Sequence, residues 1–503
     1  MMSHIIGIDI GTSGIKVGSM NKEGVMAYLE YQPYSLLYPQ KGWVEIDLED
    51  IWCKTKSLLL KVWHQVEMEG TIDAVSLSTF CNSSVFLNEK GEPLSHGIMY
   101  LDQRSKAEAD WIKDVVGEDL LYEVTRNRLE PGMYTVTTHL WFKKHHPDLY
   151  EQTHKWGNIS TFILHKLTGC FVMDWTQSSF TGMYDVENYQ WSSKIYEKVG
   201  IDGEKLPKVV DPHSIIGDLI LPEVSSKGTV PVVAGAADTS CSAVALGVGI
   251  NEMFESVGTS NVLTVCTDQP DCLDSRFLNR CHVIKDRWLS HGAMSFPGVS
   301  IQWFYEQWLK PEGHTKAIFE DLCKQSPIGA NGVFFLPYMQ GERSPIWDAN
   351  ARGVFAGIHL NTSKADMFRA ILEGCSFGLR QIYEIIETNY KIQVDHFSSI
   401  GGGAKNKDWA QIKANVLNKC IHIKSISETG VLGACLIGGT AIGYFSSLEE
   451  AVGKINNPTV CQIEPKQDQL QPYDRLYHVF LELYPSLKTF FAISAAQSLK
   501  GGE

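Results

Sequence analysis

The stretch "GIDIGTSGIKV", Gly7–Val17, places a Gly-Thr-Ser turn between two short apolar runs that favour β-strands. About half a chain away, "ESVGTSNVLTV", Glu255–Val265, repeats this arrangement. Glycine permits a tight turn and lets a ligand approach the backbone, while exposed amides and hydroxyls suit phosphate oxygens. An ordinary hairpin turn is the structural alternative. Two copies in matching contexts nevertheless favour a pair of phosphate-binding turns from two related halves.

The composition is that of a globular protein with room for two cores. The chain has 503 residues, of which 44% are hydrophobic, and a net charge of −14. This acidic balance disfavours a nucleic-acid partner, which normally requires a basic face. No apolar run has the length of a membrane span, and the N-terminus lacks a signal-peptide pattern, so we expect a cytoplasmic protein without a membrane partner. The twelve cysteines include no C-x-x-C pair, which favours reduced thiols over a zinc or redox site.

Strands that alternate with helices favour an α/β fold. Ile5–Ile10 is predicted as a buried first strand, and Leu48–Val66 and Arg104–Val115 have helical patterns. In the second half, Ser363 begins a capping motif for a helix that extends to about Tyr390. The segment "YDRLYHVFLELYPSLKTFFAIS" predicts a helical tail that packs on the second domain or on a partner chain.

Two aspartates accompany the small-residue turns. Asp9 precedes the first turn, where it is either a turn-stabilising residue or a carboxylate for Mg²⁺ beside a phosphate. Asp238, in "GAADTSCSAVALG", is either a helix cap or a general base that takes a proton from a substrate hydroxyl. Lys16 adds a cation after the first turn, and the glycine turn in "IGGGAKNKDW", Ile400–Trp409, suits a nucleotide. These parts suffice for phosphoryl transfer, which requires mainly positioning and charge neutralisation.

The ordered set of motifs resembles the FGGY carbohydrate kinases of the actin/hexokinase/Hsp70 ATPase superfamily. The resemblance extends from about Ile5 to Phe445 and includes "IGIDIGTSGIKV", "GWVEIDLEDIW", "YLDQRS", "ESVGTSNVLTV" and "RAILEGCSFGLR". It implies an α/β fold of two ribonuclease-H-like (actin-like ATPase) domains with a cleft between them. We expect an N-terminal FGGY domain over 1–247, with the sugar-binding side and the first phosphate turn. A C-terminal FGGY domain over 248–503 would carry the nucleotide side, with a helical tail from about 446.

The resemblance also implies roles for individual residues. Asp238 would be the catalytic base, and Asp9 and Asp238 would hold Mg²⁺. The residues expected to bind ATP are Asp9, Gly11, Thr12, Ser13, Lys16, Gly258, Thr259, Ser260, Gly298, Gly401, Gly402, Gly403, Ala404 and Asn406. The residues expected at the sugar are Cys81, Asn82, Asp102, Asp238 and Thr239. For Asp102 a solvated loop or helix cap is the alternative, and Trp43 and Glu45 either edge the sugar cleft or pack on a strand.

The substrate-side residues depart from the family pattern. Xylulose and gluconate kinases usually carry Met-His, and glycerol kinases Arg-Glu, where this chain has Cys81-Asn82. Asn82 still donates and accepts hydrogen bonds. The resemblance implies an ATP-dependent sugar kinase, with a pentulose such as xylulose as the leading substrate and gluconate, another sugar acid or a polyol as alternatives.

Two rival classes are an idle sugar- or ATP-sensing protein and a chaperone-like ATPase. The presence of Asp9 and Asp238 opposes the first class, and the ordered sugar-kinase motifs oppose the second.

We also expect the protein to form a homodimer.

Overall fold

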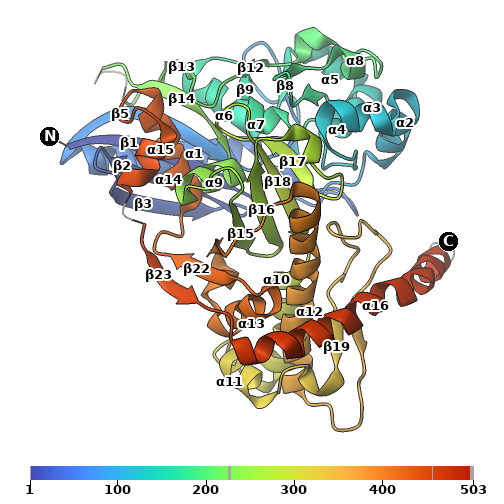
Figure 1. Cartoon of the computed structure of the whole chain (residues 1–503). Coiled ribbons are helices and arrows are strands. Elements are labelled where there is room, and N and C mark those ends of the chain that lie inside the picture. Colours follow the sequence, from blue (N-terminus) through green and yellow to red (C-terminus); the bar gives the residue numbers. More distant parts are fainter. Residues whose placement is uncertain (1, 225–227, 456, 499–503) are drawn as a thin grey trace.

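The computed structural model describes residues 2–224, 228–455 and 457–498. Figure 1 shows two sheet-containing parts, with a group of helices beside the first sheet. This mixed α/β architecture confirms the predicted fold class. No helix of the described residues is long and apolar enough to cross a membrane.

The first sheet has six strands in the order β13-β14-β5-β1-β2-β3. Their bounds are β1 Met2–Gly11, β2 Gly14–Asn21, β3 Met26–Pro33, β5 Gly70–Thr79, β13 Ile215–Asp218 and β14 Pro231–Ala237. β1 and β14 each run parallel to β5, whereas β2 runs antiparallel to β1 and β3. The isoleucines of β1 are fully buried, because helices cover both faces of this strand.

The second sheet has seven strands in the order β17-β18-β16-β15-β21-β22-β23. Their bounds are β15 Met253–Val257, β16 Asn261–Thr267, β17 Leu278–Cys281, β18 Trp288–Met294, β21 His396–Ile400, β22 Cys420–Lys424 and β23 Thr459–Ile463. Strands β18-β16-β15-β21-β22 repeat the directions of β3-β2-β1-β5-β14, two antiparallel pairings followed by two parallel ones. The predicted duplication is therefore present, and each half opens with a hairpin that carries Gly-Thr-Ser.

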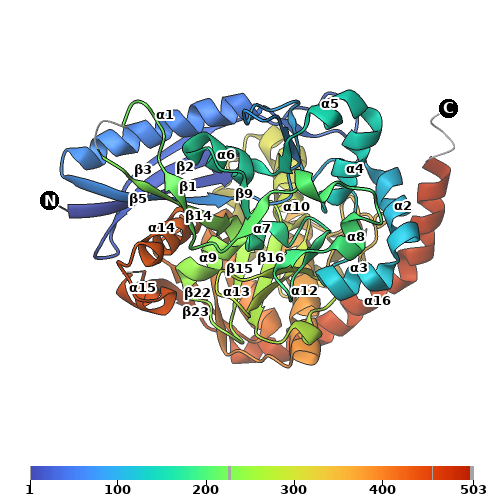
Figure 2. The same ribbon diagram turned by 90° about the horizontal axis from the view of Figure 1, so that it is seen from above.

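Helices from both halves of the chain cover the first sheet. α1, Leu48–Glu67, packs against β2 and β3, and the Asp47 side chain caps its first turn. α14, Thr429–Ala441, comes from the second half but packs on the opposite face, against β1, β5 and α9, Asp238–Leu246. Figure 2 shows α1 and α14 on either side of this sheet. α14 therefore joins the two halves, because it lies in the second half of the sequence but packs on the sheet of the first half.

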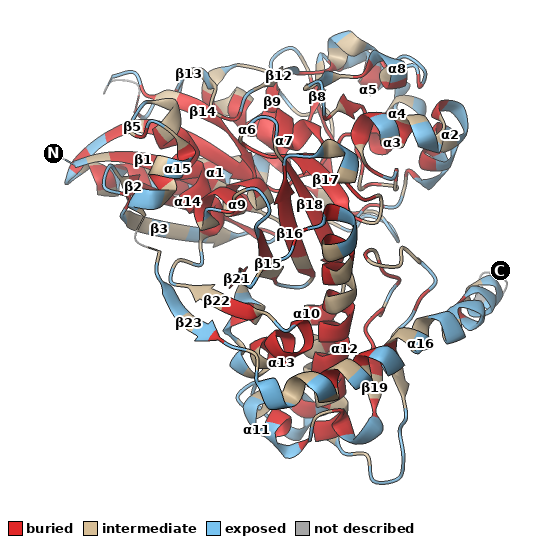
Figure 3. Cartoon of the chain, viewed as in Figure 1, coloured by how far each residue is buried: buried red, intermediate tan, exposed pale blue. Residues whose placement is uncertain are grey.

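The predicted capping motif begins the long helix of the second half. α12, Lys364–Ile385, has a capping box in which Ser363 and Asp366 each accept a hydrogen bond from the other's backbone amide. A π-helical turn, Ile386–Tyr390, follows it. The tail forms α16, Gln467–Ser498, and packs on α12. Figure 3 shows α16 as mostly exposed, and its few buried residues include Tyr473, Tyr477 and Phe480.

The other helices and the short strand pairs complete the connections. The helices are α2 Lys106–Val116, α3 Glu118–Thr125, α4 Val136–His145, α5 Pro147–Gln152, α6 Ile159–Thr168, α7 Trp175–Ser178, α8 Ser193–Tyr196, α10 Pro297–Phe304, α11 Ile318–Gln325, α13 Lys407–Leu417 and α15 Leu448–Lys454. The strand pairs are β4 Glu45–Ile46 with β7 Gly97–Ile98, β6 Val85–Leu87 with β8 Lys155–Gly157, β9 Val172–Asp174 with β12 Lys208–Val210, β10 Tyr184–Asp185 with β11 Gln190–Trp191, and β19 Phe334–Leu336 with β20 Val354–Ala356.

A fully buried ion pair ties the second sheet to α13. Both carboxylate oxygens of Glu255, on β15, lie 2.6 Å from Lys413 Nζ on α13, and neither side chain is exposed. Asn261 and Ser399, on the neighbouring strands, donate to the same carboxylate at 3.0 and 2.5 Å. The charge of Glu255 is therefore balanced within the chain. Glu255 lies on the strand that leads into the second Gly-Thr-Ser turn.

Lys413→Met should destabilise the second domain, because it leaves the Glu255 carboxylate buried without its cation. We expect a loss of about 3–5 kcal/mol in unfolding free energy, measured by urea denaturation. The double variant Glu255→Gln/Lys413→Met, which removes both charges, should recover most of this loss. A single variant within about 1 kcal/mol of wild type would contradict the assignment of a charge-balancing role.

Candidate active site

The two Gly-Thr-Ser turns lie at the ends of equivalent hairpins. The first joins β1 to β2, where Gly11 pairs with Gly14, and Tyr34 donates to the Gly11 carbonyl at 2.6 Å. The second joins β15 to β16, and Gly258 N donates to the Ser260 carbonyl at 2.8 Å. Both turns are at least partly exposed. The residues of both turns are therefore accessible, and their contact with a phosphate remains a prediction.

Asp9 ends β1 beside a serine and near a second carboxylate. Ser78 Oγ, on β5, donates to Asp9 Oδ1 at 2.7 Å. Burial raises the pKa of the Asp9 carboxyl to about 6, the Ser78 hydrogen bond opposes this shift, and the negative charge of Asp238 adds to it. Lys16, the cross-strand partner of Asp9, is engaged by Glu428 at 2.5 Å. The charge of Asp9 is therefore only partly balanced by its own chain.

Asp238 is the first residue of α9, directly after β14. Its Oδ1 accepts hydrogen bonds from the backbone amide and hydroxyl of Thr239, at 2.6 and 3.0 Å. Asp9, Asp238 and Thr239 line one cavity of about 220 Å³, together with Gly401. The other residues that line it are Lys16, Ser242, Phe254, Ser256, Ile400, Ser427, Glu428, Thr429 and Gly430. The structure thus brings the two predicted carboxylates together between the halves of the chain.

Glycines from three segments pack around the second turn. A Cβ built on Gly298, at the start of α10, would lie 2.0 Å from the Gly258 carbonyl oxygen. A Cβ built on Gly401, whose φ is +91°, or on Gly403 would likewise come too close to Val257. These contacts place three of the predicted nucleotide-binding segments side by side. No heavy atom lies within 4 Å of a Cβ built on Gly402, so the face of this loop is open.

Two predicted nucleotide-binding residues have structural partners. Ala404 is buried, and the Asn406 side chain caps α13 by accepting from Trp409 N at 3.1 Å. Their contact with a nucleotide remains a prediction.

The predicted sugar residues lie on the first domain, beyond β5. Cys81 and Asn82 are buried, and Asn82 Nδ2 donates to the Met133 carbonyl at 2.7 Å. Asp102 is fully buried, and both its oxygens already accept hydrogen bonds from Arg104 and from Val44 N. The Asp102 carboxylate thus fixes the loop before α2, and its contact with a sugar remains a prediction.

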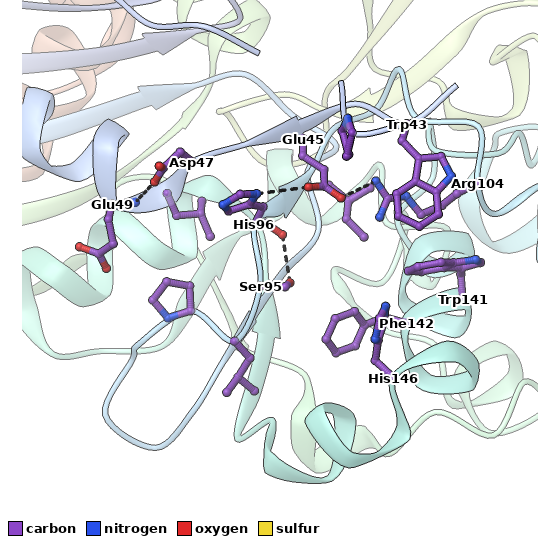
Figure 4. A pocket seen from close by; sticks show the side chains of 15 residues that line it. Trp43, Glu45, Asp47, Glu49, Ser95, His96, Arg104, Trp141, Phe142 and His146 are labelled. Carbon is purple, nitrogen blue, oxygen red and sulfur yellow. Dashed lines mark hydrogen bonds and ion pairs between the residues drawn. The ribbon is translucent and has the colours of Figure 1, made fainter. Parts of the chain in front are cut away.

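A second hollow, of about 620 Å³, is lined by Trp43 and Glu45 and is shown in Figure 4. The Arg104 guanidinium lies 3.7 Å from the Trp43 ring centre and 4.9 Å from that of Trp141, and it donates to Glu45 at 2.8 Å. None of the residues lining this hollow also lines the Asp9–Asp238 cavity. Trp43 and Glu45 therefore contact Arg104, and whether they also edge the sugar cleft remains a prediction.

Sequence reasoning missed the contribution of α14 to the cavity. Glu428 pairs with Lys16, and the Thr429 hydroxyl lies 2.9 Å from that of Ser242. A Cβ on Gly430 would lie 2.5 Å from the Asp9 carboxylate. The small residues of this helix were the signal for such close packing, but they do not indicate which strand the helix meets.

The duplicated topology, the paired turns and the shared cavity define a phosphotransferase-type cleft of the actin-like ATPase class. Models of the N- and C-terminal domains of the FGGY family of carbohydrate kinases match residues 4–245 and 253–442. The chain belongs to this family, which confirms the resemblance seen in its motifs.

Individual relatives agree with this assignment. The chain is 28% identical to a xylulose kinase of Staphylococcus xylosus, over 96% of this chain and 100% of that protein. It is 25% identical to a gluconokinase of Bacillus subtilis, over 96% of each. The crystal structure of ligand-bound xylulose kinase from Lactobacillus acidophilus matches with a TM-score of 0.90 and 25% identity, over 97% of this chain and 99% of that one.

Gly298→Ala should weaken ATP binding, because the added methyl group displaces the Gly258–Ser260 turn from α10. We expect the Kd for ATP, measured by calorimetry, to rise by about tenfold, or about 1.4 kcal/mol. Gly453→Ala is the matched control, since a Cβ there meets no heavy atom within 4 Å. Unchanged ATP affinity in a folded Gly298→Ala protein would contradict a role for this turn.

Proposed function

We propose that this kinase transfers the γ-phosphate of ATP to a hydroxyl of a small sugar bound on the Asp238 side of the cleft. The observation that carries the proposal is the cavity shared by Asp9, Asp238 and Gly401. Asp238 is held by Thr239 at the start of α9, and it accepts the proton of the attacking hydroxyl. Approach of the two domains excludes water, which limits wasteful hydrolysis of ATP.

The two turns and α10 provide donors for the phosphate oxygens. Gly11–Ser13 act from the first domain and Gly258–Ser260 from the second, so the phosphate chain lies between them. The partly exposed Lys16 adds a positive charge on the first side. Gly401–Gly403 lie at the start of a 3-10 turn, Gly402–Lys405, and their lack of side chains leaves room for the nucleotide. Holding the phosphates from both domains positions them in line with the sugar hydroxyl.

Mg²⁺ fits the donor set of this cavity. Asp9 carries a carboxylate whose charge is incompletely balanced, with Asp238 nearby. No cluster of three or more metal-binding side chains occurs in the part of the chain that the structure describes. Mg²⁺ is commonly held by one or two carboxylates together with substrate phosphates. When bound, Mg²⁺ neutralises charge on the transferring phosphoryl group.

The names of the relatives support two kinds of sugar. Several of the similar proteins are named xylulose kinase, so the relatives taken alone favour a pentulose as the substrate. Gluconokinases act on a sugar acid and supply the alternative. Cys81, Asn82, Asp102 and Thr239 are the proposed sugar-side residues.

A cytoplasmic homodimer remains part of the proposal, and light scattering tests the dimer.

Asp238→Ala should nearly abolish phosphorylation because it removes the proton acceptor. We expect kcat to fall by about 10²–10⁴-fold in a coupled ADP-release assay, with ATP affinity little changed. Calorimetry with ATP shows whether the variant still binds nucleotide. Wild-type turnover by this variant would exclude Asp238 as the base.

The value of kcat/KM for Mg-ATP should fall as the pH drops below about 6. Protonation of Asp9, whose pKa is about 6, removes the negative charge that holds the cation. Ser78→Ala removes a hydrogen bond that favours the ionised form, so the descending limb should move to higher pH.

Ser242→Ala is the control for this experiment. Ser242 lines the same cavity but bonds to Thr429 rather than to Asp9, so its pH profile should match wild type. A shift to lower pH in Ser78→Ala would contradict the role of this hydrogen bond.

A further inference from the structure

Arg280 is buried where the two halves of the chain meet. It lies on β17, at the edge of the second sheet, and only 6% of the residue is exposed. Its guanidinium carbon lies 4.2 Å from the ring centre of Phe180, and its Nη1 lies 3.2 Å from the Cys81 sulfur. Arg280 of the second sheet thus reaches the Cys81-Asn82 pair that departs from the family pattern.

Among the described residues Arg280 forms no ion pair, and its Nε has no hydrogen-bond partner. Asp174 is near enough for the two charges to interact, but it forms no ion pair with Arg280. Its Oδ1 caps α7 through Thr176 and Gln177, and its buried Oδ2 accepts no hydrogen bond from a described residue. An arginine stays charged in proteins, and a thiol is a weak acceptor. A buried cation in this situation is incompletely compensated.

Three further buried polar atoms have no hydrogen-bond partner among the described residues. They are the Tyr134 hydroxyl and His291 Nε2, whose rings lie beside Phe180, and Oδ1 of Asn82, the residue after Cys81. The Tyr134 and His291 rings lie 6.0 and 6.4 Å from the ring of Phe180. Burial lowers the pKa of His291 well below its usual value, so its ring is neutral. The group therefore offers one cation with polar atoms suited to hydroxyls.

We propose that Arg280 is a specificity-determining residue that binds a carboxylate on the sugar, so that this kinase prefers a sugar acid to the neutral sugar of equal length. This inference rests on the proposed function. A carboxylate accepts two parallel hydrogen bonds from a guanidinium, and it replaces the weak Cys81 contact with a charged one. Asn82, Tyr134 and His291 then bind hydroxyls along the chain of the sugar.

The position of Cys81 relates this group to the catalytic carboxylate. Ala237, directly before Asp238, pairs with Thr79, two residues before Cys81, so Asp238 and Cys81 follow the ends of neighbouring parallel strands. Arg280 contacts Cys81 and therefore lies near the same strand ends as Asp238. An open-chain acid with its carboxylate at Arg280 therefore extends toward Asp238. Since these polar atoms are closed off from solvent, the sugar enters when the two halves separate, and the halves then close around it.

The test compares matched acid and neutral substrates. The probes are D-gluconate with D-glucitol and D-xylonate with D-xylulose, measured as kcat/KM by coupled ADP release. We expect the better acid to exceed its neutral counterpart by about 100-fold or more in the wild type. Arg280→Met should reduce this ratio to below about tenfold, and Arg280→Lys, which keeps the charge but not the fork, should give an intermediate value.

Binding is measured separately from turnover, by the thermal shift that each sugar produces in the presence of a non-hydrolysable ATP analogue. Arg276→Gln is the matched control, because Arg276 precedes the same strand but pairs with Asp274. This variant should keep the acid preference.

A wild-type preference for D-xylulose, or an acid preference unchanged in Arg280→Met, would overturn the inference while leaving the sugar-kinase function intact. Absence of both turnover and thermal shift with the acids would also overturn it. ADP release that does not depend on Asp238 would instead contradict the proposed function.

Discussion

The contact on which the rest of this structure depends is the close approach of α14 to the first sheet. A Cβ on Gly7 would lie 2.5 Å from the Val431 carbonyl, and one on Gly433 would lie 2.1 Å from the Cys241 carbonyl. Only glycine permits such an approach, because any side chain would push the helix away. At the start of the same helix, Gly430 lies against Asp9. The packing that joins the two halves therefore also forms a wall of the cavity.

The buried charges of the molecule fall into two groups. Glu255 and Lys413 satisfy one another inside the second domain, and Asp102 and Arg104 do so in the first. Asp9 and Arg280, by contrast, have no full partner among the residues that the structure describes. Fully paired groups stabilise a single arrangement of the loops and strands around them. Incompletely paired groups at the junction of two domains instead favour the binding of an oppositely charged ligand.

Much of the fold and part of the site could be predicted from local patterns. The repeated turns indicated the duplicated halves, and Ser363 indicated the start of α12 through its capping box. Asp9 and Asp238 were recognisable because each stands beside small residues at the end of a predicted strand. Such signals depend only on neighbouring residues in the sequence, and the turns, cap and strand ends that they indicate are present in the structure.

The remaining features depend on contacts between distant segments. The pairing of Lys16 with Glu428 joins residues more than four hundred positions apart, and no local pattern indicates it. The same holds for Arg280, which looks like an ordinary strand residue until Cys81 and Phe180 are placed beside it. Trp43 and Glu45 were ambiguous for this reason, since only the fold brings Arg104 between the two tryptophans.

The origin of α14 also has a consequence for synthesis of the protein. Val431, Cys435 and Ile437 complete the apolar cluster around Ile5 and Val233. During translation, that face of the first sheet stays uncovered until residues close to the end of the chain leave the ribosome. The nascent first half thus exposes an apolar surface for most of its elongation, which is the kind of surface that chaperones bind. The segment that completes the catalytic cleft is the same one that ends this exposure.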